Sequence, residues 1–323
     1  MISRKERKPL ELARSLEPFY GQKLNSVVYV PAFALIARLR MGELQDVQRI
    51  VEPFLNGTKD SLKGATSSHL SGHLIFGDLA ERTGNQAYIE LVRRAADLGF
   101  NPDGTMKESM PFHDEMSDSV FMGCPILAKA GKLTGEKKYF DMALRHFRFM
   151  QSLDKRKDGL YRHSPLDESA WGRGNAFPAL GLALTLSDLP KDHPAYAEML
   201  SAFQNLMMTL AEFQDQETGM WRQVVDHPGV YPEFTSTAMI GRSMLIGIRN
   251  GWLDEKTYQP RVQAAWRAVL ERTSADGQLI DVCESTGKQK SLEDYLFRRA
   301  ILGNDDRGGA MAMIFAVEMA GLK

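Results

Sequence analysis

Residues 163–177 hold the densest set of side chains that could bind a sugar. Their sequence, HSPLDESAWGRGNAF, places Trp171 before two glycines that flank Arg173, with Asn175 and Phe177 directly behind. An indole can stack on a sugar ring, a planar guanidinium can hold a carboxylate through two parallel hydrogen bonds, and an amide can bind a hydroxyl. This pattern predicts a site for an acidic sugar.

The same segment also has a purely structural interpretation. Asn175 can cap a helix predicted over 175–187, while Trp171 fills the core where the loop meets it. That interpretation leaves Arg173 between two glycines unexplained. We therefore favour a sugar site and keep the structural alternative open.

A carboxyl candidate, Asp118, lies in the segment HDEMSDSVFMG at residues 113–123. The residues after it are almost all apolar, which predicts a helix buried on most sides and leaves Asp118 at its outer end. Ser117 or Asp118 could simply cap that helix, since hydroxyl and acidic residues are common at helix N-termini. A lone carboxyl at the mouth of a buried helix is also a functional candidate, and we predict that Asp118 is catalytic.

Three weaker features complete the candidates. His69 and His73 lie one helical turn apart, a spacing that can hold a metal, but no third ligand stands at a motif position. Glu233 opens the segment EFTSTAM, where it is a helix cap by default and a wall of the site by position. The segment ESTGK at 284–288 lacks the glycines and the strand of a phosphate-binding loop. We predict neither a metal nor a cofactor.

Helical periodicity dominates the chain, whereas strand-like alternation extends over a few residues at a time. Segments such as SVFMGCPILAKAG and GGAMAMIFAVEMAG are apolar nearly all round, which is typical of helices buried on most sides. Segments such as KKYFDMALRHFRFMQSL carry one apolar stripe and one charged face, which is typical of outer helices. We predict twelve helices, near residues 8–20, 25–40, 44–56, 69–83, 86–99, 117–131, 138–151, 175–187, 195–213, 236–250, 258–273 and 306–321.

The two kinds of helix alternate along the chain. Glycine turns of the type NPDG, KDGLYRH, ETGMWRQ and ADGQLID follow outer helices, and each leads into the next apolar helix. A Thr-Gly turn followed by a tyrosine recurs at residues 83–88 and 134–139, a weak internal repeat. Six inner and six outer helices predict an all-α fold, an (α/α)6 barrel of six helical hairpins. We expect one catalytic domain over residues 1–323, with its chemistry where the long loops meet the N-termini of the inner helices.

Composition excludes several other classes of protein. The 323 residues carry a formal net charge of −1, which argues against a nucleic-acid or anionic-membrane partner. No apolar run approaches the roughly 20 residues that span a bilayer, and the first residues lack the apolar core of a signal peptide. The two cysteines form no disulfide framework, so we expect a cytoplasmic protein. The oligomeric state is not predicted.

These motifs together resemble a known family of enzymes. The order DSVFMGCPILAKAGKLTGEKKYFDMA, GLYRH, AWGRGN, EFTSTAMIGRSMLIGIRNGWLDE, DVCESTGK and GGAMAMIFAVEMAG is similar to glycoside hydrolase family 105, the unsaturated rhamnogalacturonyl hydrolases. That family is related to the unsaturated glucuronyl hydrolases of family 88. The resemblance covers roughly residues 70–323, and it implies an (α/α)6 barrel, in agreement with the helix pattern.

The resemblance also implies roles for individual residues. Asp118 matches the catalytic acid and base of the family, His163 the histidine after the Gly-Leu-Tyr turn, and Trp171 and Arg173 the substrate-contacting pair. The chain departs from the family at Phe177, where members often have Trp, and at Met116, where they often have an aromatic residue. The second acidic residue of the family is replaced by the segment TSSHLSGH, with His69 or Ser67 nearest. The predicted substrate-binding residues are His163, Trp171, Arg173, Asn175, Phe177, His69, Met116, Trp221 and Glu233.

The family chemistry is removal of a 4,5-unsaturated uronic acid from the non-reducing end of lyase-generated oligosaccharides. By this resemblance Asp118 protonates C4, water adds at C5, and the resulting hemiketal opens. Two other interpretations stay open. One is a different (α/α)6 carbohydrate enzyme, either a polysaccharide lyase or a sugar epimerase with His163 as base. The other is a non-catalytic glycan-binding protein that uses Trp171, Trp221 and Arg173 only to bind.

Overall fold

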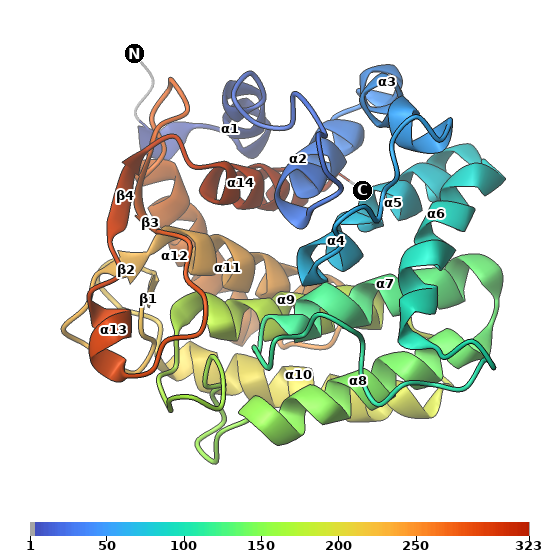
Figure 1. The fold of residues 1–323 in the computed structure, drawn as a ribbon. Coiled ribbons are helices and arrows are strands. Elements are labelled where there is room, and N and C mark those ends of the chain that lie inside the picture. The colour runs from blue at the N-terminus through green and yellow to red at the C-terminus, as the bar shows by residue number, and fades with distance from the viewer. Residues whose placement is uncertain (1–3, 323) are drawn as a thin grey trace.

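The computed structural model describes residues 4–322 and consists of helices in two concentric rings (Figure 1). The inner ring is formed by α2 (Tyr29–Arg40), α4 (Ser67–Gly72) with α5 (Leu74–Thr83), α7 (Ser119–Thr134), α9 (Gly172–Asp188), α11 (Phe234–Arg249) and α14 (Asp306–Met319). The outer ring is formed by α1 (Pro9–Leu16), α3 (Leu44–Leu55), α6 (Gln86–Ala96), α8 (Lys137–Asp154), α10 (Pro194–Glu212) and α12 (Glu255–Glu271). Because α14 packs against both α11 and α2, the inner ring closes on itself.

The remaining elements are short. The helix α13 (Leu292–Leu296) and the 3-10 turns η1 (Arg4–Glu6) and η2 (Asp97–Gly99) lie in connections. Strand β1 (Trp221–Arg222) pairs antiparallel with β2 (Pro232–Glu233), and β3 (Leu279–Cys283) pairs antiparallel with β4 (Ala300–Gly303), with Cys283 opposite Ala300. These strands and α13 gather on one side of the helical rings, on the left in Figure 1.

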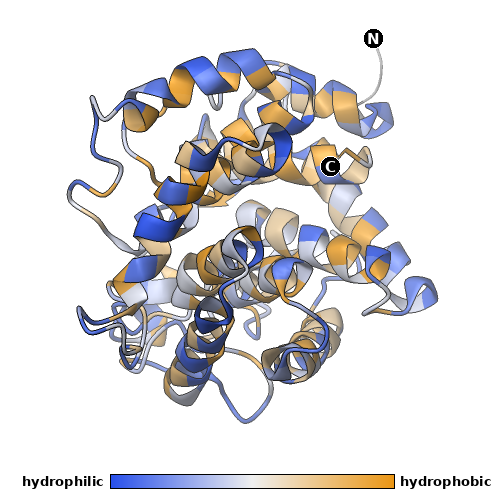
Figure 2. Ribbon diagram, turned by 90° about the vertical axis from the view of Figure 1, so that its right-hand side faces the viewer, coloured by the Kyte–Doolittle hydropathy of each residue, from blue (hydrophilic) through white to orange (hydrophobic). Residues whose placement is uncertain are grey.

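Burial separates the two rings as their composition predicts. In α7 every residue from Ser119 to Gly131 is buried, whereas α8 buries one face only. Helices on the periphery alternate between hydrophilic and hydrophobic residues along the ribbon (Figure 2). Close packing inside depends on glycine, since a Cβ at Gly181 of α9 would lie 2.7 Å from the backbone of Phe121 in α7. The predicted (α/α)6 barrel is confirmed, and its core is one continuous hydrophobic cluster.

Each predicted helix corresponds to an observed one, but α1 ends at Leu16 instead of residue 20, α2 begins at Tyr29 instead of residue 25, and two larger differences remain. The helix expected over 69–83 is divided into α4 and α5 at His73, whose imidazole Nδ1 lies 2.6 Å from the carbonyl oxygen of His69. The neighbouring Gly72 packs so tightly that a Cβ there would lie 2.1 Å from the Val27 carbonyl oxygen. The short helix α13 and the four strands were not expected individually, because elements of two to five residues carry almost no periodic signal.

The inner helices begin on the side of the strands and end on the opposite side (Figure 1). The barrel therefore has two chemically different mouths, one made of helix N-termini and long loops and one made of helix C-termini. Among residues 4–322, no helix is both long and apolar enough to cross a membrane. The assignment of residues 1–323 to a single catalytic domain stays a prediction, and residues 1–3 and 323 lie outside the described part.

Candidate active site

Asp118 lies at the N-terminal end of α7, at the mouth that carries the strands. It occupies the N-cap position of the helix, yet its side chain accepts no hydrogen bond from the first turn of α7. The carboxylate is 15% exposed, and its Oδ1 is buried without a hydrogen-bond partner in the described part of the chain. The capping alternative therefore does not account for Asp118, because a capping carboxylate accepts backbone N–H groups.

His163 is an ionisable neighbour of Asp118. Its Nε2 lies 3.4 Å from Oδ1 of Asp118, and its Nδ1 lies 2.8 Å from the hydroxyl of Tyr295. That hydroxyl already accepts the backbone N–H of Gln289, so we assign its proton to Nδ1 of His163. In this tautomer the ring N–H hydrogen of a neutral His163 is on Nε2, the nitrogen 3.4 Å from Oδ1 of Asp118, although the two atoms do not form a hydrogen bond in this structure. The imidazole is fully buried, with its ring centroid 4.4 Å from that of Trp171.

Two backbone contacts fix the segment that carries Asp118. The N–H group of Ser117 donates to the carbonyl of His163 over 3.0 Å, and the Ser117 hydroxyl donates to the carbonyl of Gly174 over 2.7 Å. The turn before α7 is therefore tied to both the GLYRH segment and the start of α9. These ties position Asp118 against His163.

The guanidinium of Arg173 is committed to protein groups, which corrects the expectation of a fork free for a substrate carboxylate. Its Nη1 donates to the carbonyl of Cys283 over 2.5 Å, and its Nη2 donates to the carbonyl of Glu284 over 2.7 Å. The group stacks 4.5 Å from the Trp171 ring, lies 3.6 Å from Glu233, and is 2% exposed. Arg173 thus holds the loop after β3 against Trp171.

Three further candidates have structural roles instead of the expected contact with substrate. Asn175 is fully buried, and its amide binds both backbone groups of Tyr161 and the carbonyl of Trp171. Trp221 is fully buried and donates its indole N–H to the carbonyl of Leu210. Glu233 caps α11 by accepting the N–H groups of the first turn, and it also accepts the N–H of Cys283.

The last three candidates, Phe177, His69 and Met116, are buried or half-buried near the N-termini of inner helices. Phe177 is 2% exposed and packs in an aromatic cluster with Tyr29 and Phe121. His69 is buried, with Nε2 at 2.8 Å from the Ser26 hydroxyl and Nδ1 accepting the N–H of Thr66. Met116 is half-buried in the turn before α7. Contact of these three residues with substrate stays a prediction.

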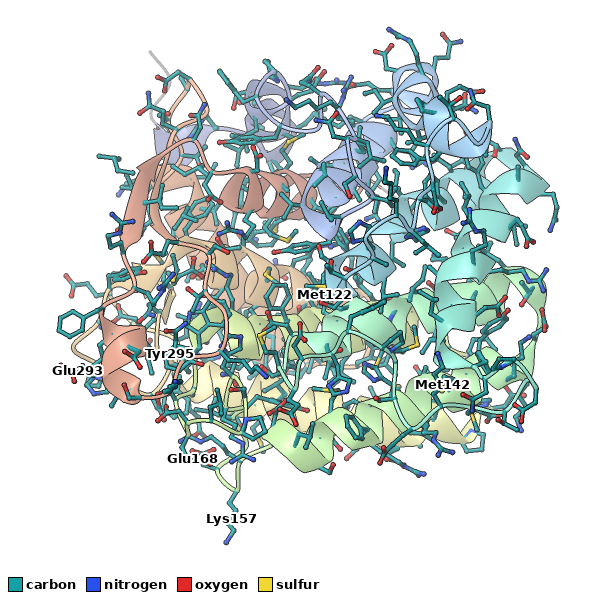
Figure 3. The ribbon with its side chains drawn as sticks, viewed as in Figure 1. Met122, Met142, Lys157, Glu168, Glu293 and Tyr295 are labelled. Atoms are coloured by element: carbon teal, nitrogen blue, oxygen red, sulfur yellow. The ribbon has the colours of Figure 1, made fainter. Side chains whose placement is uncertain are left out.

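The structure adds Tyr29 and Tyr295, which sequence reasoning missed. Tyr29 begins α2, and burial raises its pKa to about 12 while the charges of Arg173 and Arg307 oppose that rise. Tyr295 belongs to α13, which Figure 3 shows on the side of the strands. No motif marks either tyrosine. Tyr295 in particular lies in a five-residue helix far along the chain from His163.

Asp154 is a second buried carboxyl close enough to Asp118 to feel its charge. It ends α8, is 1% exposed, and neither of its carboxyl oxygens has a hydrogen-bond partner among the described residues. Burial raises the pKa of Asp154 to about 8, the cation of Arg162 opposes this rise, and the negative charge of Asp118 adds to it. Asp154 therefore keeps its proton at neutral pH.

The ring of helix pairs, with a carboxyl and a histidine at its loop-bearing mouth, defines a class of carbohydrate-active barrel enzymes. The sequence pattern of Glycosyl Hydrolase Family 88 matches residues 43–323, so the chain belongs to this family. The solved structure of a possible GH105 family member from Salmonella enterica shares the fold, with a TM-score of 0.79, 21% identity, and coverage of 99% of this chain and 95% of that chain. The resemblance drawn from the motifs is confirmed.

Two curated relatives carry more specific names. The chain is similar to the unsaturated 3S-rhamnoglycuronyl hydrolase of Formosa agariphila, with 28% identity over 180 residues, which are 50% of this chain and 48% of that protein. It is also similar to the unsaturated rhamnogalacturonyl hydrolase YesR of Bacillus subtilis, with 24% identity over 254 residues, 73% of this chain and 70% of that protein. The chain thus spans about half the length of the Formosa relative in this match.

Proposed function

We propose that this protein removes a 4,5-unsaturated uronic acid from the non-reducing end of lyase-generated oligosaccharides by hydrating the double bond. The observation that carries the proposal is the contact of Asp118 with His163 beside the Trp171 ring, at the mouth formed by inner-helix N-termini. The names of the two relatives support the same substrate class.

The proposed reaction needs one carboxyl that acts first as acid and then as base. Asp118 gives its proton to C4, and the electron pair of the C4–C5 double bond forms the new C–H bond. A water oxygen then bonds to C5 while the water gives a proton to the Asp118 carboxylate. The hemiketal at C5 opens by breaking its bond to the ring oxygen, and the leaving sugar departs from C1 afterwards.

The acid step requires a protonated carboxyl, whereas an ordinary aspartate is ionised at pH 7. Asp154 bears on this difficulty because the negative charge of Asp118 helps to raise its pKa to about 8, so Asp154 holds a proton at neutral pH. A carboxyl proton is therefore present in the neighbourhood of Asp118 at neutral pH. Nε2 of His163 lies 3.4 Å from Oδ1 of Asp118, within reach of a hydrogen bond after a small shift of either side chain.

A second requirement is a cation for the carboxylate of the substrate. Because Arg173 is occupied by loop carbonyls, Arg307 in the first turn of α14 is the better candidate. Its side chain is 24% exposed, and its nearest acceptors are distant, with Asp305 at 3.8 Å and the Cys283 carbonyl at 3.5 Å. Inner-helix N-termini add partial positive charge at the same mouth.

The experiment that tests the proposal is incubation with unsaturated disaccharides from pectin, glycosaminoglycan and ulvan digests. Loss of their near-ultraviolet absorbance together with release of the leaving sugar is the expected result. A glycan-binding protein would leave the absorbance intact, an epimerase would change the sugar and spare the double bond, and a lyase would raise the absorbance on polymer. The cytoplasmic location and the absence of a nucleic-acid partner stay predictions.

A further inference from the structure

A large cavity lies at the mouth opposite the candidate active site. Its volume is about 830 Å³, and it is lined by residues of α2, α5, α7, α9, α11 and α14, most of them from the half of the helix that contains the C-terminus. Its charged lining residues are Arg40, Asp78, Glu81, Arg82, Lys129, Lys132, Asp188, Arg242, Arg249 and Glu318. The proposed glycosidase function uses none of these residues.

The lysines of this cavity are balanced by acidic partners. Lys129 lies 3.0 Å from Glu81 and 2.9 Å from Asp188. Lys132 lies 2.7 Å from Glu81 and 2.8 Å from Asp188. This half of the cavity is a closed network of two cations and two anions, so it leaves no net charge for a ligand.

The arginines on the other side of the cavity are not balanced. Arg40, Arg242 and Arg249 all pair with the same carboxylate, Glu318, at 3.1, 3.4 and 2.6 Å. Asp78 is the other nearby carboxylate, and it lies 3.5 Å from Arg40. Three guanidinium groups therefore share two carboxylates, which leaves an excess of positive charge.

Two of these arginines also have buried N–H groups that donate no hydrogen bond to any described residue. Within the described part of the chain, Nη1 of Arg242 and Nε of Arg40 are buried without a hydrogen-bond partner. Arg242 is 1% exposed, so its unpaired N–H groups cannot turn to bulk water without a shift of the side chain. Burial lowers the pKa of Arg242 to about 10, with Arg40 acting in the same direction and Glu318 against it.

Helix dipoles do not account for this arrangement. The C-termini of six inner helices carry partial negative charge, and cations in the last turn compensate it. Arg249 does so directly, since it is the final residue of α11 and its Nη2 donates to the carbonyl of Glu318. Arg242 lies about two turns before the C-terminus of α11, where the helix dipole no longer attracts a cation. Its side chain is also buried.

We propose that this cavity is a second ligand site, which binds a small molecule bearing a phosphate or sulfate group through Arg242 and Arg40. A tetrahedral oxyanion supplies several acceptors at once, and the guanidinium fork matches it in geometry as well as charge. Exposed residues such as Lys132 and Arg249 form the rim, so the ligand enters from the solvent side. The proposal does not depend on the glycosidase function.

The test is calorimetric titration of the full chain with inorganic phosphate and, separately, with sulfate, at constant ionic strength set by chloride. Saturable binding of phosphate or sulfate in excess of chloride is expected. Arg242→Gln should weaken it at least tenfold, and Glu318→Gln should strengthen it severalfold because the resident carboxylate no longer competes. The matched control Arg267→Gln, on the exposed face of α12, should bind like the parent protein.

Opposite effects of the two substitutions separate a ligand site from a merely structural charge cluster. If Arg242→Gln does not fold, Arg40→Gln provides the same comparison, since Arg40 carries the second unpaired donor. The proposal is overturned if neither anion binds saturably. It is equally overturned if Arg242→Gln and Arg40→Gln bind phosphate or sulfate as well as Arg267→Gln does.

Discussion

Nε2 of His163 lies 3.4 Å from Oδ1 of Asp118, and the other ring nitrogen of His163 lies 2.8 Å from the Tyr295 hydroxyl. A tyrosine, a histidine and a carboxyl thus form a chain that runs from α13 to the N-terminus of α7. The arrangement fixes which imidazole nitrogen faces the carboxyl. It places an imidazole nitrogen next to the proposed acid at the barrel mouth.

Asp118→Asn should abolish turnover and leave the fold intact, because an amide cannot supply the proton for C4. We expect kcat to fall by about 10²–10⁴-fold, the range usual for loss of a general acid. Steady-state kinetics on an unsaturated disaccharide, with circular dichroism as the folding control, provides the measurement. Near-parental turnover in a folded variant would return Asp118 to a purely structural role.

Tyr295→Phe should lower kcat without removing the fold, because Nδ1 of His163 then loses its hydrogen-bond partner and the favoured tautomer. The loss should be smaller than for Asp118→Asn, about tenfold, since Tyr295 acts through His163. The pH profile of kcat should also shift, which loss of packing alone would not cause. An unchanged pH profile with unchanged kcat would contradict the assigned tautomer.

Arg173→Lys should destabilise the protein by about 2 kcal/mol, because lysine cannot serve the carbonyls of Cys283 and Glu284 together. Arg307→Gln should instead raise KM at nearly unchanged stability, since Arg307 is partly exposed and weakly paired. Urea unfolding and steady-state kinetics on both variants give the comparison. The reverse pattern would restore Arg173 as the carboxylate ligand.

Much of the fold could be predicted from the sequence, because inner and outer helices differ in composition. The segment that became α7 is apolar on all sides, and that of α8 is apolar on one side, so their places in the two rings follow from burial alone. The division between α4 and α5 could not be predicted. It depends on contacts of Gly72 and His73 with other parts of the chain.

The candidate site was predictable only in part. Asp118 and His163 were named from their segments and from the family resemblance, and the structure brings them together. The partners of Arg173 could not be predicted, because backbone carbonyls of a distant loop carry no sequence signal. A buried tryptophan such as Trp221 also looks the same in sequence as one that stacks on a sugar.

Asp154→Asn should stabilise the protein in a pH-dependent manner. Burial raises the pKa of Asp154 to about 8, so in the folded state it holds its proton at pH values where the unfolded chain has lost it. The contribution of Asp154 to the free energy of unfolding is therefore greatest below about pH 4, and it falls by roughly 1.4 kcal/mol per pH unit up to about pH 8. Asparagine does not ionise, so the variant does not lose stability through this group as the pH rises.

Thermal unfolding of the parent protein and Asp154→Asn between pH 5 and pH 9 measures this effect. The difference in Tm should grow from pH 5 to pH 8 in favour of the variant and then level off. A difference that does not change with pH would mean that Asp154 is ionised in the folded protein.

The central claim is that Asp118 hydrates a double bond and does not attack a glycosidic bond. A conventional retaining hydrolase would need a second carboxylate about 5 Å from the first. Glu233 cannot take that role, because its carboxylate is fully buried and caps α11. The two mechanisms place atoms from water at different carbons of the product.

The most direct measurement is to run the reaction on an unsaturated disaccharide in heavy water and, separately, in water enriched in oxygen-18, and to locate both labels by NMR and mass spectrometry. Hydration by Asp118 places deuterium at C4 and oxygen-18 at C5 of the released sugar. Product without deuterium at C4 and with oxygen-18 at C1 would contradict this mechanism.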